Sequence, residues 1–262
     1  MHASRPSPSS LLAARAREGA RVSARVLHFG AIVLTLALSP SSYRGPWRRP
    51  LAAQLVRAAL PLLPWFTLLA AVLSLVVIRI VLVTALSYGL SQYALEMVVR
   101  VLVLELIPLT AALAVALRVT VPMAGELARA RRDGPHESPA VTSMQRLRAE
   151  IAPRALAGVL CVLLLAAVSS LVALVLAYVL AYGFTPFAFE RYTRLVGRVF
   201  TPLVSLLFVL KTGALALAVS VLPIGSALHG RAGVAGLELQ GLVRMFVAVL
   251  AIEVAGLAGN YI

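Results

Sequence analysis

Two ionisable side chains of opposite charge lie inside long apolar stretches of this sequence. Glu105 lies in the stretch from Ala94 to Val121, and Lys211, the only lysine, lies about halfway along a later stretch. A charge at the centre of a bilayer costs about 2.5–3.5 kcal/mol on insertion scales, so such residues mark a polar pathway or an ion pair. We therefore expect Glu105 and Lys211 either to lock two helices together or to form two walls of a hydrated cavity.

Three other residues in apolar stretches need an explanation. Pro108 follows Glu105 by three residues and is expected to loosen the helix one turn after it. Arg79 and Glu253 lie toward the outer ends of their stretches. For both, we expect the side chain to reach the interface or solvent.

Catalytic and metal-binding chemistry has little support in the sequence. The four histidines are scattered without ligand spacing, Asp133 is the only aspartate, and no nucleophile-elbow pattern surrounds Ser226 and His229. No G-x-x-x-x-G-K-S/T loop occurs, so the chain is not expected to bind ATP itself. We predict no catalytic residue, no metal site and no cofactor in this chain.

The residues that could bind a ligand or carry out chemistry are expected to be positioned by membrane helices. The chain has 262 residues, 61% of them hydrophobic, against about 45–50% in soluble domains. This predicts an all-α membrane protein, with breaks at Gly183–Pro186 and Pro223–Gly236. The five expected spans are Leu62–Leu86, Ala94–Val121, Ala155–Tyr182, Val199–Leu222 and Leu239–Ala258.

Arginine placement predicts the orientation. Nine arginines precede the first span, six lie in the central loop and one, Arg231, lies in the last loop, whereas only Arg191, Arg194 and Arg198 lie on the opposite side. By the positive-inside rule, the N-terminus is expected in the cytoplasm and the C-terminus outside. The net charge of +14 is better explained by anionic lipid headgroups than by nucleic acid, because the arginines lie at span ends and in loops and no nucleic-acid motif is recognisable.

The N-terminal segment, residues 1–58, is basic and is assigned to a region of its own, before a transmembrane domain at 59–262. Its apolar stretch Val26–Ser39 is too short to span a bilayer comfortably. A signal or transit peptide could have this composition. An interfacial helix explains both the arginines and the short length, and is the preferred interpretation.

The loop Gly125–Arg154 is the second functional candidate. Its middle predicts a turn, after which Ser138 is a plausible N-cap and Pro139 a first helical residue. A short helix, Ala140–Ile151, would follow. The alternative is an ordinary solvated basic loop.

Four sequence pieces resemble one family. Leu104-Glu105-Leu106-Ile107-Pro108 is similar to the L-R-E-L-G-P of the MlaE/YrbE permeases, and Arg118 with Glu126-Leu127 is similar to their R-A-G-x-x-x-x-A-E-I/L. Pro153 to Gly158 resembles P-R-x-x-A-G, and Lys211-Thr212 lies where the family has K-S. The resemblance covers roughly Arg48 to the C-terminus. Leu104 and Ile107 depart from the family's Arg and Gly, so the chain resembles a divergent member.

The resemblance implies an MlaE-like permease fold and a function. Such a chain would be the homodimeric permease of an ABC transporter that moves phospholipid between the bacterial inner membrane and a periplasmic MCE-domain partner. ATP and Mg²⁺ would bind a separate cytoplasmic ATPase. The substrate cavity would include Glu105, Lys211, Pro108 and Arg118. The coupling residues facing the ATPase would be Glu126, Arg131, Ser138, Met144 and Arg148.

Two alternatives remain at this point. An integral membrane enzyme of lipid metabolism would need clustered Asp, His or Ser at a membrane surface, which the sequence lacks. A membrane scaffold of the same complex that has lost transport is compatible with the motif departures.

Overall fold

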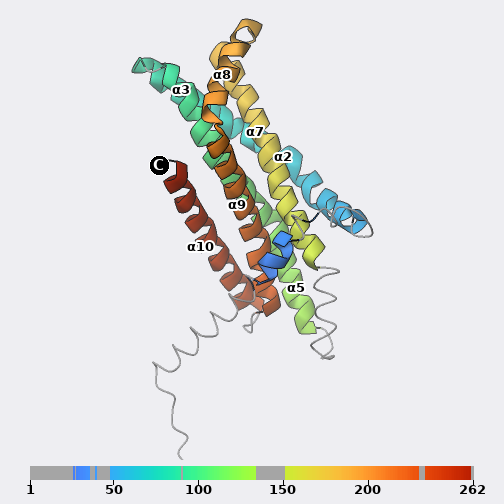
Figure 1. The fold of residues 1–262 in the computed structure, drawn as a ribbon. Helices are drawn as coiled ribbons and strands as arrows, with labels where there is room; N and C mark the ends of the chain where they lie inside the picture. The colour runs from blue at the N-terminus through green and yellow to red at the C-terminus, as the bar shows by residue number, and fades with distance from the viewer. Residues whose placement is uncertain are drawn as a thin grey trace, which may run out of the picture.

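The computed structural model describes residues 26, 28–35, 39, 48–89, 91–133, 151–229 and 234–260. Within these ranges the chain is helical and contains no strand, which confirms the predicted all-α class. Figure 1 shows long helices that lie side by side as a bundle. Five of the described helices are long and apolar enough to cross a membrane, in agreement with the five predicted spans.

The first, third, fourth and fifth spans are each a single helix. They are α2 (Arg48–Ser87), α7 (Ala152–Tyr182), α9 (Pro202–His229) and α10 (Val234–Asn260). A short 3-10 turn, η6 (Pro186–Ala188), and helix α8 (Phe189–Val199) connect α7 to α9. Helix α2 begins well before Leu62, the predicted start of the first span. It therefore continues across the expected boundary between the N-terminal region (1–58) and the transmembrane domain (59–262).

The predicted break Pro223–Gly236 begins too early, because α9 ends at His229 and α10 begins at Val234. Helix α9 continues through Pro223 to His229. A helix in or near a membrane tolerates an internal proline when neighbouring helices and local adjustments satisfy the freed backbone groups. Here α9 has neighbours along its length, because it packs against α10, α7 and α5.

The second span is one continuous helical run with changing hydrogen-bond geometry. Its parts are α3 (Ser91–Val98), the π-helical η3 (Val99–Leu106), α4 (Ile107–Val115), the π-helical η4 (Ala116–Thr120) and α5 (Val121–Asp133). The N–H of Ile107 donates to the carbonyl of Leu102, five residues back. Pro108 then lies in the first turn of α4, where a proline is tolerated. The first π-helical segment, η3, therefore precedes Pro108 and contains Glu105, whereas η4 follows Pro108.

Small residues allow α7, α9 and the second span to approach closely. A Cβ added at Gly158 of α7 would lie 2.8 Å from Ser220 Oγ of α9 and 3.3 Å from Thr120 Cγ2. The hydroxyl of Thr120 donates to the carbonyl of Val219 at 2.8 Å. Side-chain packing of this kind, together with interhelical hydrogen bonds, holds membrane helices together in the absence of a water-driven hydrophobic effect.

Part of the predicted N-terminal helix is described. Residues 28–35 are helical, and Val26, Phe29 and Val33 are buried. Val26 packs against Gly225 of α9, where an added Cβ would come within 2.9 Å of Val26 Cγ1. The segment is therefore attached to the bundle, and its position at the membrane interface stays a prediction.

The predicted helix Ala140–Ile151 lies outside the described residues except for Ile151, which directly precedes α7. Ser138, Met144 and Arg148 also lie outside them. Arg131 is described only as part of the backbone of α5.

Candidate functional site

Three ionisable side chains from three helical segments meet inside the bundle. Lys211 of α9 forms ion pairs with Glu105 of η3 and with Glu253 of α10. The distance from Lys211 Nζ to Glu253 Oε2 is 2.6 Å. The side chains of Lys211, Glu105 and Glu253 are only 5%, 17% and 15% exposed. We call these three residues the charge triad.

The triad confirms one expectation and corrects another. Glu105 and Lys211 do form an ion pair, one of the two predicted arrangements. The prediction that Glu253 reaches the interface or solvent is wrong, because its carboxylate is directed to Lys211 instead. Counting residues from the end of a span gives depth but does not show which neighbour a side chain meets.

A glycine one turn along α10 makes room for the lysine. A Cβ added at Gly256 would lie 2.9 Å from Lys211 Cδ and 3.2 Å from its Cε. Glu253 and Gly256 are three residues apart and therefore share one face of the helix. A glutamate and a glycine at this spacing were the available sequence signal that α10 approaches another helix closely.

An apolar pocket adjoins the triad. It has a volume of about 240 Å³ and lies between the second span, α9 and α10. Lys211 is the only charged residue among those that line it, and the apolar members include Leu104, Leu207, Phe208 and Ala214. Pockets that bind amphiphilic ligands are mostly apolar with a few placed polar groups. This pocket could hold an acyl chain or another apolar group beside a cation.

The family comparison covers the helices that form this site. A family model described as Permease MlaE matches residues 51–257, which include the whole triad and all five spans except a few terminal residues. The chain belongs to the MlaE permease family. A search of curated proteins finds no match to the sequence.

Membership gives this MlaE-family permease a general function. It is a multi-pass membrane subunit of a lipid ABC transporter, and a transporter subunit rather than an enzyme. Within the described residues, no group of three His, Cys, Asp or Glu side chains could hold a metal ion.

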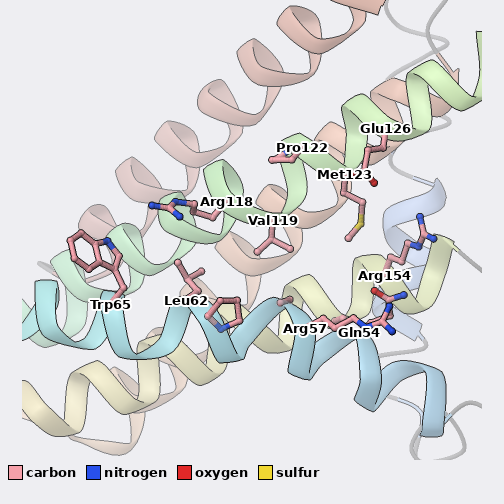
Figure 2. A pocket seen from close by; sticks show the side chains of 13 residues that line it. Gln54, Arg57, Leu62, Trp65, Arg118, Val119, Pro122, Met123, Glu126 and Arg154 are labelled. Atoms are coloured by element: carbon pink, nitrogen blue, oxygen red, sulfur yellow. The ribbon is translucent and has the colours of Figure 1, made fainter.

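Two residues with predicted roles in this permease, one in the substrate cavity and one in contact with the ATPase, lie in a second site. Arg118 and Glu126 are exposed and line a groove of about 310 Å³ formed with α2 and the start of α7 (Figure 2). Arg118 therefore does not join Glu105 and Lys211 in the pocket beside the triad. Pro108 is buried in α4, one turn beyond Glu105.

Proposed function

We propose that this permease moves phospholipid or a similar amphiphile between the bacterial inner membrane and a periplasmic MCE-domain partner. It would act as a homodimer, with ATP and Mg²⁺ bound by separate cytoplasmic ATPase subunits. The observation that supports this most strongly is the charge triad beside an apolar pocket in a lipid-transporter permease.

The energetic cost of the triad favours a functional role. Removing charged groups from water costs several kcal/mol per ion, and apolar side chains of similar volume are often equally stable or better. The bundle already has extensive apolar cores on both sides of this depth. A purely structural ion pair is therefore an expensive way to join η3, α9 and α10.

The triad offers a binding site that can switch. Lys211 borders the pocket and also contacts two carboxylates. A lipid phosphate entering the pocket would compete with Glu105 and Glu253 for the ammonium group, because charge-assisted hydrogen bonds to phosphate are strong. Transport requires two arrangements that bind the lipid differently, and exchange of the partners of Lys211 supplies such a difference.

We also propose that the loop Gly125–Arg154 transmits ATP binding to the bundle. The structure corrects the ends of this predicted loop, because residues 125–133 are helical and belong to α5, and residues 152–154 belong to α7. Helix α7 packs against α2, α4 and α9. In this proposal the N-terminus lies in the cytoplasm and the C-terminus in the periplasm. Glu126, Arg131, Ser138, Met144 and Arg148 would face the ATPase.

The test compares Glu105→Ala and Lys211→Ala with the wild type in proteoliposomes. The permease is purified together with its ATPase and MCE-domain partners, and lipid transfer is followed with a fluorescent phospholipid. Each substitution is expected to lower the transfer rate at least tenfold while the complex still assembles. The control is Glu190→Gln, which breaks an exposed ion pair with Arg194 on α8.

Normal transfer by both triad variants would refute the site assignment. If the wild-type complex assembles but neither transfers lipid nor stimulates ATP hydrolysis, the chain is a scaffold and the transport proposal fails.

A further inference from the structure

We propose that the groove between α2, the end of the second span and the start of α7 binds the phosphate headgroup of an anionic phospholipid. This basic groove is defined by Arg57, Arg118, Arg154 and Trp65. It is separate from the pocket beside the charge triad. The inference requires only that the permease lies in a bilayer, so it does not depend on the proposed transport.

Three guanidinium groups from three elements line this one groove. Arg57 belongs to α2, Arg118 to η4 and Arg154 to α7. In the view of Figure 2, Arg57 and Arg154 lie toward one end and Arg118 lies near Trp65 toward the other. Arginine presents a planar set of donors that matches phosphate geometry, and two arginines at one end can share a single phosphate.

The charges of these arginines are not neutralised by the described part of the protein. Within the described ranges, none of the three guanidinium groups forms an ion pair or a side-chain hydrogen bond. Glu126 is the only acidic residue among those that line the groove. The groove thus carries an excess of positive charge that an anionic ligand would satisfy.

The groove lies at the depth of a lipid headgroup. Arg57 is near the beginning of α2, and Arg154 is near the beginning of α7. Arg118 follows Glu105, the charge deep in the same span, by 13 residues. This spacing places Arg118 at most about 20 Å further along the helix axis, toward the end of the span. Trp65 is 60% exposed, and tryptophan is enriched at membrane–water interfaces. Basic pockets between membrane helices at this depth are typical anionic-lipid sites.

The apolar part of the groove favours a lipid over free phosphate. Pro61, Leu62, Val119 and Met123 line it together with the arginines. The neighbouring residues Leu60, Leu68 and Leu117 are 71%, 60% and 59% exposed. An acyl chain can therefore continue from the groove onto the apolar surface of the bundle, whereas free phosphate would use only the arginines.

Trp65 allows the occupant to be detected directly. The chain has two tryptophans, so a Trp47→Phe background leaves Trp65 as the only one. The permease in this background is placed in phosphatidylcholine nanodiscs that contain an equal mole fraction of either brominated phosphatidylglycerol or brominated phosphatidylcholine. Quenching of Trp65 fluorescence is expected to be at least twofold stronger with brominated phosphatidylglycerol.

Substitutions test whether the groove causes this preference. Arg57→Gln with Arg154→Gln is expected to bring the quenching ratio of the two lipids close to one. The matched control is Arg49→Gln, an exposed arginine on the same end of α2 that does not line the groove, and it is expected to keep the ratio. Lys211→Ala, which alters the triad, is also expected to keep it.

Three results would overturn the proposal. Equal quenching by the two lipids in the unsubstituted groove would show that it has no preference for an anionic headgroup. An equal loss in Arg49→Gln would show general attraction of anionic lipid to the basic surface. Equal quenching by the two lipids, together with a change of Trp65 fluorescence on adding inorganic phosphate but not sodium chloride of equal ionic strength, would assign the site to free phosphate.

Discussion

At the scale of single residues, the position of Lys211 depends on the absence of a side chain at residue 256. The lysine reaches Glu253 across the face of α10, and its aliphatic stem passes over Gly256. A methyl group there would overlap Lys211 Cδ, so the lysine must move away from its present course. The ion pair with Glu253 is therefore sensitive to a substitution that changes no charge.

We expect Gly256→Ala to lower lipid transfer severalfold while the protein still folds. The end of a lysine side chain is flexible, so it can move aside at modest cost to stability, but its contact with Glu253 weakens. Lipid transfer in proteoliposomes measures the effect. Gly259→Ala is the matched control, because its nearest neighbours are the Leu207 methyl groups at 3.9 Å. Equal transfer by the two variants would contradict the role given to the lysine position.

Two members of the charge triad could be predicted from the sequence, and the third could not. Glu105 and Lys211 could be predicted as partners because each is a charge placed deep in an apolar stretch. Glu253 was assigned to the interface because it lies five residues before the predicted end of its span, where an outward-reaching side chain is plausible. Its actual direction depends on the packing of α10 against α9, and Gly256, three residues further along, was the local sign of that close approach.

At the scale of elements, the contact of α7 with α9 rests on Gly158. We expect Gly158→Ala to destabilise the permease by about 1–2 kcal/mol, since an added methyl group overlaps Ser220 Oγ and overpacking costs of this order are typical. Gly213→Ala on α9 is the opposite case, because no atom lies within 4 Å of an added Cβ. It should gain up to about 1 kcal/mol from helix propensity. Thermal unfolding in detergent measures both, and a loss of stability only in Gly213→Ala would contradict this packing.

Helix α8 is attached to α7 through Tyr192. Its hydroxyl donates to the carbonyl of Leu174 at 2.7 Å, and the ring contacts Tyr178 and Tyr182. Burial, with a smaller contribution from Tyr182, raises the pKa of Tyr192 from 10.0 to about 12. The neutral hydroxyl therefore persists well above the pH at which an exposed tyrosine ionises.

We expect Tyr192→Phe to lower stability by about 1 kcal/mol near neutral pH, because one buried hydrogen bond is lost. Since the pKa is raised in the folded state, this contribution is complete below pH 10 and is lost as the pH rises through about 12. Unfolding of wild type and variant over this pH range measures it. A stability difference that stays constant to pH 12 would contradict the assignment.

Hydropathy predicts where the membrane helices lie but not their internal hydrogen-bond geometry. The five spans were predictable because a bilayer requires runs of about 20 apolar residues. The π-helical turns in the second span were not, because hydrogen-bond spacing responds to helix packing and leaves no strong composition signal. The break between the fourth and fifth spans was placed too early, at Pro223, because proline ends helices in water more readily than among packed membrane helices.

At the scale of the whole molecule, the two candidate sites lie in different parts of the bundle. The pocket beside the triad is formed where the second span, α9 and α10 meet, whereas the basic groove lies between α2, α7 and the end of the second span. Helices α2 and α10 are the least buried of the five spans. In the proposed homodimer, the pocket beside the triad would become part of a chamber shared by two copies.

The most direct test of this account asks whether lipid occupies the pocket beside the triad. A photoreactive amino acid replaces Leu207, which lines the pocket, or Leu171, which is 64% exposed on α7. The complex is illuminated in membranes that contain a labelled phospholipid, in the presence of its partners. We expect labelling at residue 207 that falls at least fivefold in Lys211→Ala, and labelling at residue 171 that does not depend on Lys211. Equal dependence at both positions, or no labelling at residue 207, would contradict the central claim that Lys211 holds lipid inside the permease.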